Sequence, residues 1–477
     1  MAAAAISMLA ACSAGPDYRK PVVEMPLAWK LEAPWREGAP RDTAAKGAWW
    51  ENYAEPQLDV LVRQTLAGSP TIAAANARLA QAQASVTAVS AGLFPQVGLG
   101  PRVARGKISG NRPLTNYASP NFSTIQDDFI AAFSVNYEAD VFGRVRRSIE
   151  GARASAAQSA ADAENVRLLL ITELAVDYFS LRALDIELDV LLRSIELQKR
   201  ALDLVSARHD LGAASGLDLA QQQALLDSTL TQVDLLRKQR SQFEHAIATL
   251  TGTPAPNFSL APDLKVPRSP SFPIGVPSDL LERRPDVAAA ERAMAAANAQ
   301  VGVANAAFFP SITLGSNYGG ESTSLATLFA APSIIWSLGA SLTQPLFDGG
   351  RIRANVEAAR AGYDVTVANY RRIVLVAMQE VEDGISGVTT LERASAQAQQ
   401  AIASASRVLD LANARYEGGV ATYLDVITAQ QALLTSERQA AQLLGQRLLT
   451  SVFLVKALGG DWQGQGALAD RTASPAR

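Results

Sequence analysis

The sequence predicts a mainly α-helical chain with a membrane β-barrel, built from two internal repeats of one unit. Three observations predict this fold class. Motifs of the first half recur in the second half at a nearly constant offset, two long stretches lack proline and carry apolar residues at helical spacing, and short segments alternate apolar and polar residues. Each repeat has the order helix, two strands, long helix, tight turn, helix.

Composition limits the chemistry that the chain can perform. Of its 477 residues, 48% are hydrophobic and 19% are charged, which suffices for a buried core. The 43 Lys and Arg residues nearly balance the 46 Asp and Glu residues, which argues against nucleic acid as the main partner. Two histidines and one cysteine are too few for a zinc site or a disulfide framework, so no cofactor is expected. No run of about 18 apolar residues predicts a transmembrane helix.

The first residues resemble the end of a secretory signal. Residues 1–11 are apolar, and Leu9-Ala10-Ala11-Cys12 resembles a bacterial lipobox. That resemblance implies cleavage before Cys12 and acylation of Cys12, with palmitate as one of the acyl chains. Because Ser13 follows, it also implies localisation to the outer membrane. No basic residue precedes Cys12, so the true start is expected upstream. A buried structural cysteine is the alternative. The proline-containing residues 12–56 are expected to form an extended, lipidated tether.

The two repeats span residues 57–252 and 278–460. Pro70-Thr-Ile-Ala-Ala-Ala75 matches Pro285-Asp-Val-Ala-Ala-Ala290, and Arg144-Val-Arg146 matches Arg351-Ile-Arg353. A proline-rich linker (253–277) joins the repeats, and a polar tail (461–477) follows them. Each repeat begins with a helix, about 71–91 and 286–307, that ends at a Phe-Pro pair, where a helix is not expected to continue.

Alternating segments predict two strands in each repeat, at about 96–106 and 127–142 and at about 311–318 and 333–344. Phe129, Phe133 and Tyr137, for example, are separated by polar residues such as Ser134 and Asn136. This pattern suits a barrel wall with one lipid face and one wet face. A soluble sheet with one buried face would show the same pattern.

Two long helices follow the strands, at about 145–211 and 351–418. In the first, Leu174, Leu181 and Leu188 fall seven residues apart, as in a coiled coil. A helix of about 67 residues would be about 100 Å long, far longer than a globular domain needs.

Four strands cannot close a membrane barrel, because an open edge in lipid leaves backbone groups unpaired. Known membrane barrels have about eight strands or more. Several chains must therefore share one barrel if the strands span a membrane. Three chains would supply twelve strands.

Several motifs resemble the TolC-like outer-membrane efflux channels, in their lipoprotein branch. The resemblance covers about residues 12 to 460. Its motifs are Trp49-Trp50-Glu-Asn-Tyr53, Pro273-Ile-Gly-Val-Pro-Ser-Asp-Leu-Leu-Glu-Arg-Arg-Pro-Asp-Val287, Gln344-Pro-Leu-Phe-Asp-Gly-Gly-Arg351 and Arg415-Tyr-Glu-Gly-Gly-Val420.

This resemblance implies a homotrimer with a twelve-stranded barrel in the outer membrane above a helical barrel in the periplasm. It also implies the outer-membrane exit duct of a tripartite pump, which passively conducts small toxic compounds from a periplasmic adaptor protein and an inner-membrane RND-type transporter. One alternative is an exit duct for type I protein secretion. An alternative of another class is a lipid-anchored periplasmic coiled-coil scaffold without a pore.

The turns between the long helices supply glycine where one helix stops and Ser or Thr where the next begins. Locally they are helix hairpins. The resemblance implies that they also form the periplasmic tip that contacts the adaptor, through Gly212, Ala213, Ala214, Ser215, Gly419, Val420, Ala421 and Thr422.

The resemblance further implies a pore constriction just beyond the turns. Three copies of Leu424 would form an apolar ring that gates by dewetting. Asp425 is alternatively only a helix cap. The expected constriction residues are Leu217, Asp218, Leu424, Asp425 and Thr428.

The remaining polar and charged residues do not indicate a catalytic site. No Ser-His-Asp or paired-carboxylate arrangement stands out, so an enzyme is not expected. Gly349-Gly350 lacks the lysine and spacing of a phosphate loop and is expected to be a strand-to-helix turn. The arginines 144, 146, 147, 283 and 284 are expected to be surface charge.

Overall fold

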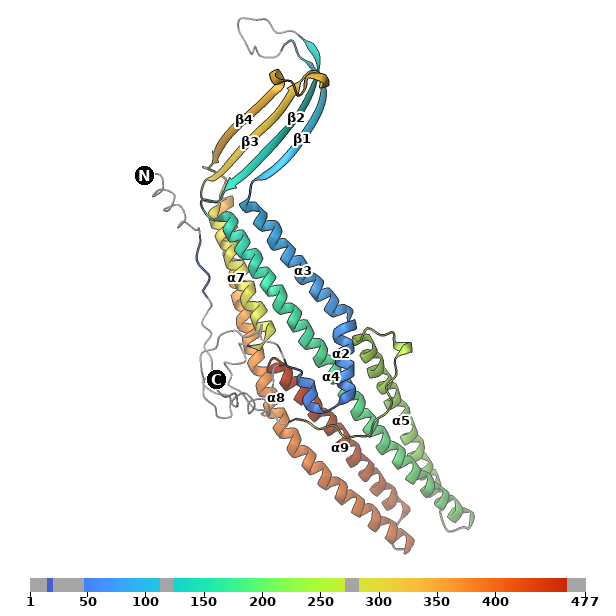
Figure 1. Ribbon diagram of the computed structural model, residues 1–477. Coiled ribbons are helices and arrows are strands. Elements are labelled where there is room, and N and C mark those ends of the chain that lie inside the picture. The colour runs from blue at the N-terminus through green and yellow to red at the C-terminus, as the bar shows by residue number, and fades with distance from the viewer. Residues whose placement is uncertain (1–14, 20–46, 112–122, 271–282, 461–477) are drawn as a thin grey trace, which may run out of the picture. The chain divides into compact units, whose positions relative to one another are not determined.

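The computed structural model describes residues 15–19, 47–111, 123–270 and 283–460. These residues are mainly helical and include one small sheet (Figure 1), as the sequence predicts. Contacts divide the chain into two compact units. Unit 1 contains residues 1–22, 78–159 and 289–370, and unit 2 contains residues 23–77, 160–288 and 371–477.

The order helix, two strands, long helix, returning helix occurs twice along the chain. The main helices are α2 (Pro56–Gly68), α3 (Pro70–Ser90), α4 (Arg144–Asp210), α5 (Gly216–Leu250), α7 (Pro285–Ala306), α8 (Arg351–Glu417) and α9 (Tyr423–Ala457). Both long helices, α4 and α8, have 67 residues, and both returning helices, α5 and α9, have 35. Within the described residues, none of the helices has the length and apolar character needed to cross a membrane.

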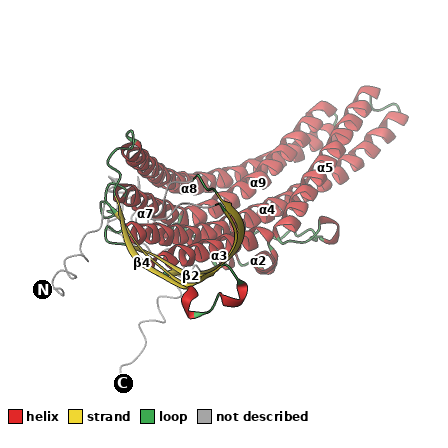
Figure 2. Ribbon diagram, turned by 90° about the horizontal axis from the view of Figure 1, so that it is seen from above, coloured by secondary structure: helices red, strands yellow, loops and turns green. Residues whose placement is uncertain are grey.

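Unit 1 contains one antiparallel sheet of four strands in the order β1-β2-β3-β4. Seen from above, this sheet is curved into an arc (Figure 2). Its strands are β1 (Gln96–Ile108), β2 (Thr124–Ala139), β3 (Ser311–Ser322) and β4 (Ile334–Thr343).

The register places large apolar side chains on one face of the sheet. Leu99 pairs with Phe133, Phe133 with Tyr318, and Tyr318 with Trp336, so these side chains form one row across all four strands. The opposite face is polar. There Arg102 binds Asp128 at 2.7 Å, from β1 to β2. The alternation that predicted the strands therefore separates an apolar face from a wet face.

An aspartate begins each long helix in unit 1. The carboxylate of Asp140 accepts hydrogen bonds from the backbone N–H groups of Val145 and Arg146, at 2.9 and 2.8 Å. Asp348 accepts the N–H groups of Gly350 and Ile352 at 3.0 and 2.8 Å. Both aspartates satisfy N–H groups that have no partner inside the helix. The Gly349-Gly350 segment is thus a strand-to-helix turn.

The core of unit 2 includes aromatic residues from the end of the expected tether. The 3-10 helix η1 (Trp49–Tyr53) buries Trp49 and Tyr53, each only 2% exposed. The Tyr53 ring lies 4.9 Å from the Phe179 ring, and its hydroxyl lies 2.8 Å from Ser451 Oγ. Residues 49–53 therefore form a helical turn whose three aromatic side chains are buried, and not a part of the extended tether, because large aromatic rings gain much from burial.

The long helices of unit 2 pack through the predicted leucine seam. Leu184, Leu191 and Ile195 of α4 share one buried cluster with Val233 of α5 and Leu434 of α9. Heptad spacing puts these α4 side chains on one face, which explains why two helices can cover it.

Two of the five arginines expected on the surface are buried. Arg147 is 5% exposed and Arg284 is 3% exposed. Arg284 binds Asp286 and Glu380, both at 2.7 Å, and also donates to the Ala457 carbonyl at 3.1 Å. Charge at these positions is buried because it is paired and hydrogen-bonded, which is the condition for burying an ion.

Candidate functional site: the helix turns and the contacts behind them

The two helix turns share one backbone geometry. Gly212 and Gly419 both have a φ of 72°, a left-handed conformation that ends α4 and α8. A Cβ added at either glycine would meet no atom of the described chain within 4 Å, so both turns are open. The predicted tip residues all lie in these turns or at their ends: Gly212, Ala213, Ala214, Ser215, Gly419, Val420, Ala421 and Thr422.

Both aspartates that were predicted to line the constriction cap the start of a helix. Asp218 accepts the backbone N–H of Ser215 at 3.1 Å, and the Ser215 hydroxyl accepts the Asp218 N–H at 3.1 Å. Asp425 accepts both the N–H and the hydroxyl of Thr422 at 2.9 Å. These geometries are those of a capping box, so the carboxylates fix the start of α5 and α9.

The predicted constriction leucines point to solvent in the single chain. Leu217 is 66% exposed and Leu424 is 55% exposed. Thr428 donates its hydroxyl to the Leu424 carbonyl at 2.8 Å, one turn back along α9. Leu217 and Leu424 are thus large apolar side chains free to face a pore, and their role as a constriction stays a prediction.

Behind the turns, unit 2 ties its two helix hairpins together. Tyr423, 4% exposed, donates its hydroxyl to Gln222 Oε1 at 2.8 Å. Gln222, fully buried, donates Nε2 to the Gln198 carbonyl at 3.0 Å. The Arg208 guanidinium lies 5.0 Å above the Tyr416 ring. This link cannot be predicted from the sequence, because neither glutamine belongs to a recognisable motif.

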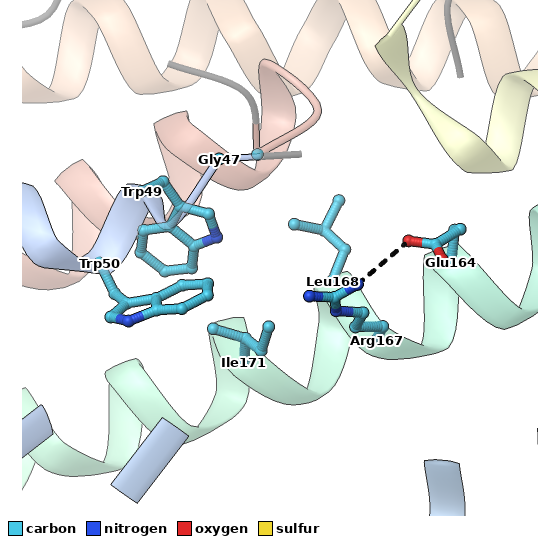
Figure 3. Close-up of a pocket in the computed structure, with 8 residues that line it drawn as sticks. Gly47, Trp49, Trp50, Glu164, Arg167, Leu168 and Ile171 are labelled. Atoms are coloured by element: carbon cyan, nitrogen blue, oxygen red, sulfur yellow. Dashed lines mark ion pairs between the residues drawn. The ribbon is translucent and has the colours of Figure 1, made fainter. Parts of the chain in front are cut away.

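A small cavity in unit 2 lies beside the two tryptophans. Figure 3 shows Trp49, Trp50 and Ile171 around it, with Arg167 turned toward Glu164 at 4.0 Å. The cavity has a volume of about 20 Å³, which is room for about one water molecule. This cavity is too small for a transported compound.

A larger groove of about 550 Å³ runs between α4, α8 and α9 in unit 2. Apolar side chains such as Val190 and Leu444 line it together with Arg193, Glu437 and Arg447. Burial raises the pKa of the Glu437 carboxyl, and Arg193 opposes that rise. The described residues contain no cluster of His, Cys, Asp and Glu suited to a metal ion.

The chain matches the family described as outer membrane efflux protein over residues 61–253 and 276–460. The chain belongs to this family. Among the relatives of this outer membrane efflux protein, the pyoverdine export outer membrane protein OpmQ of Pseudomonas aeruginosa is 33% identical, over 96% of this chain and 95% of its own length. The toluene efflux pump outer membrane protein TtgC of Pseudomonas putida is 30% identical, over 98% and 96%.

Solved structures agree with the family. The outer-membrane channel OprN superposes with a TM-score of 0.84 at 30% identity, covering 95% of this chain and 100% of that chain. The outer membrane efflux protein described here is accordingly an outer-membrane exit duct of tripartite efflux pumps, and its matches are channels rather than enzymes. Cys12, the predicted acylation site, lies outside the described residues.

Proposed function

We propose that this outer membrane efflux protein works as a lipid-anchored homotrimer that passively conducts small toxic compounds to the outside. Its expected partners are a periplasmic adaptor protein at the tip and an inner-membrane RND-type transporter. The observation that carries the proposal is the sheet of unit 1, which combines an exposed apolar face with two edge strands that have no second neighbour among the described strands.

The edges of the sheet call for further copies of the chain. Strands β1 and β4 each pair with a single neighbour among the described strands. In lipid, the free N–H and C=O groups of an edge cost several kcal/mol each, so the sheet must close. Three copies of four strands give twelve, which lies within the range of known membrane barrels.

The apolar face of the sheet calls for lipid. Trp336 is 75% exposed, Leu338 is 79% exposed and Val97 is 69% exposed. The register puts Val97 and Leu338 in one row on the same face as Trp336. Exposure of such a large apolar patch to water is unfavourable, whereas its contact with lipid is favourable. The polar face would then line the duct.

The names of relatives support small molecules as the cargo class. OpmQ is named for pyoverdine export and TtgC for toluene efflux, and neither name refers to a secreted polypeptide. The scaffold alternative has no use for an exposed apolar sheet. The names of the relatives favour the small-molecule duct over protein secretion, and the exposed apolar sheet favours it over the scaffold.

We assign the adaptor contact to the two helix turns and the constriction to Leu217 and Leu424. Open turns at the ends of the two hairpins offer a surface for a protein partner. The capping role of Asp218 and Asp425 favours leucine over aspartate as the narrowing side chain. In a trimer, three copies of each leucine would face one another around the pore.

Lipid attachment at Cys12 is tested by radiolabelled palmitate in growing cells. The full-length chain should incorporate label, and the Cys12→Ser chain should not. Label that persists in Cys12→Ser would contradict the anchor. Because Cys12 is the only cysteine, no second thiol complicates the result.

The barrel is tested with two arginine substitutions at neighbouring positions of β4. Leu338→Arg puts a charge on the apolar face, where lipid makes it cost about 2–4 kcal/mol near the middle of the membrane. Ser337→Arg puts the same charge on the polar face. Native mass spectrometry of outer-membrane extracts should show a trimer for the parent and Ser337→Arg, and strongly reduced trimer for Leu338→Arg. A monomeric parent, or equal yields from both variants, would contradict the shared barrel.

A further inference from the structure

The segment Gly15–Arg19, only three residues beyond Cys12, is held against unit 1. Its backbone and side chains contact α4 and α7 of the same unit. Arg147 of α4 donates Nη2 to Asp17 Oδ1 at 2.9 Å and to the Gly15 carbonyl at 3.4 Å. Asn298 of α7 donates Nδ2 to the Pro16 carbonyl at 3.1 Å. A free tether would not need specific partners for three consecutive residues.

Arg147 is built for this contact. Its side chain is only 6% exposed, whereas that of Asp17 is 90% exposed. Glu150, one turn along α4, accepts a hydrogen bond at 2.7 Å from the other terminal nitrogen of the Arg147 guanidinium. This bond orients the forked guanidinium toward the segment. A buried arginine whose fork is oriented by its own helix is a preorganised site for a carboxylate and a carbonyl.

Close backbone contact completes the site. A Cβ added to Gly302 of α7 would come within 2.9 Å of Arg147 Cδ. A Cβ added to Gly15 would come within 2.7 Å of Gly302 Cα. The arginine stem, α7 and the segment meet at this point, so glycine at both positions allows their approach. Asn298, 6% exposed, lies one turn away on α7.

The segment has a defined direction along α7. Gly15 contacts residue 302, Pro16 contacts residue 298, and the Tyr18 hydroxyl contacts the carbonyl of residue 291 at 3.5 Å. Its first residue is thus nearest the end of α7 that leads into β3. Three residues of chain span at most about 11 Å, so an acyl group on Cys12 could be attached no farther than this from Gly15.

We propose that Arg147, Asn298 and Gly302 form a docking site for the segment Gly15–Tyr18, which holds the acylated N-terminus at the junction between strands and helices. The proposal rests on the lipid anchor proposed above. The docking site sets the depth of the anchor relative to the sheet, because the acyl group can then move no farther than three residues of chain allow. A loose tether would let the anchor sit anywhere within its reach.

The rate of trypsin cleavage near the segment, in the full chain in detergent, reports how often the segment leaves its docking site. The bond between Arg19 and Lys20 is a trypsin site, and residues 16–19 must leave their partners to enter the protease. Asp17→Ala, at an exposed side chain, should speed cleavage of this bond about tenfold, the factor that corresponds to 1.4 kcal/mol. Arg147→Gln should do the same, and the double variant should be no faster than the faster single variant. Arg153→Gln, at an exposed arginine of α4, is the matched control and should cleave at the parent rate.

Mass analysis of the released N-terminal fragment gives the rate at this one bond. Unchanged cleavage in both Asp17→Ala and Arg147→Gln would overturn the docking site, even if palmitate labelling succeeds. Slow cleavage in the parent with faster cleavage in both variants supports docking. If palmitate then fails to label Cys12, the anchoring role is overturned while the docking site itself stands.

Discussion

At the scale of single residues, the side chain of Asp177 on α4 is a carboxyl whose ionised form is less stable in the folded chain than in the unfolded chain. Burial raises the pKa of its side chain to about 6, and the nearby Glu173 carboxylate adds to the rise. A raised pKa means that the folded chain binds the proton more tightly than the unfolded chain. Ionised Asp177 therefore destabilises the fold above about pH 6, and this cost fades as the pH falls from 6 toward 4.

Asp177→Asn should therefore raise the midpoint of thermal unfolding at pH 7.5 and change it little near pH 4. Differential scanning measurements across this pH range, on protein purified in detergent, would check the expectation. Asp203→Asn, at an exposed aspartate of the same helix, should show no such pH-dependent gain. An equal gain in both variants at every pH would contradict the assignment.

Arginine burial is the residue-scale feature that composition could not predict. Arg147 and Arg284 look like ordinary surface charge in the sequence, because two of their partners, Asp17 and Glu380, lie far away along the chain. Asp17 is 130 residues from Arg147, and Glu380 is 96 residues from Arg284. A single sequence carries no signal for such pairs.

At the scale of elements, the Tyr423 hydroxyl is one of the contacts that link the two hairpins behind the turns. Tyr423→Phe keeps the ring but leaves Gln222 Oε1 without its donor in a fully buried position. An unsatisfied buried acceptor costs about 1–3 kcal/mol, so the thermal midpoint should fall. Tyr416→Phe is the matched control, because it keeps the ring beneath Arg208 and should change the midpoint little. Equal midpoints of thermal unfolding for Tyr423→Phe and the parent would contradict a stabilising role of this hydroxyl.

Helices and strands were predictable where local chemistry determines them. Proline at 70 and 285, glycine at 212 and 419, and the period-two pattern of β2 all act over a few residues. The helix α2 and the buried η1 were not predicted, because their stability comes from packing against distant parts of unit 2. The two helix turns follow from local turn chemistry, whereas the Tyr423-Gln222 contact depends on how two hairpins pack.

At the scale of the whole molecule, the constriction requires three copies and can be tested by conductance. Leu424→Ala should raise the closed-state conductance of channels reconstituted in planar bilayers, because a ring of three alanines is wider and less apolar than a ring of three leucines. Leu235→Ala, at an exposed leucine in α5 away from the turns, is the control. Unchanged closed-state conductance in Leu424→Ala would remove this leucine from the constriction.

The central claim is that the chain is the exit duct of an efflux pump driven by protons. The most direct measurement is the accumulation of a panel of dyes and antibiotics in cells lacking the gene, with and without a proton uncoupler. Accumulation should rise without the gene, return to the parent level with the intact chain and stay high with Leu338→Arg, and the uncoupler should abolish the difference. An unchanged panel together with loss of a protein from the culture medium would contradict the claim and favour a secretion duct.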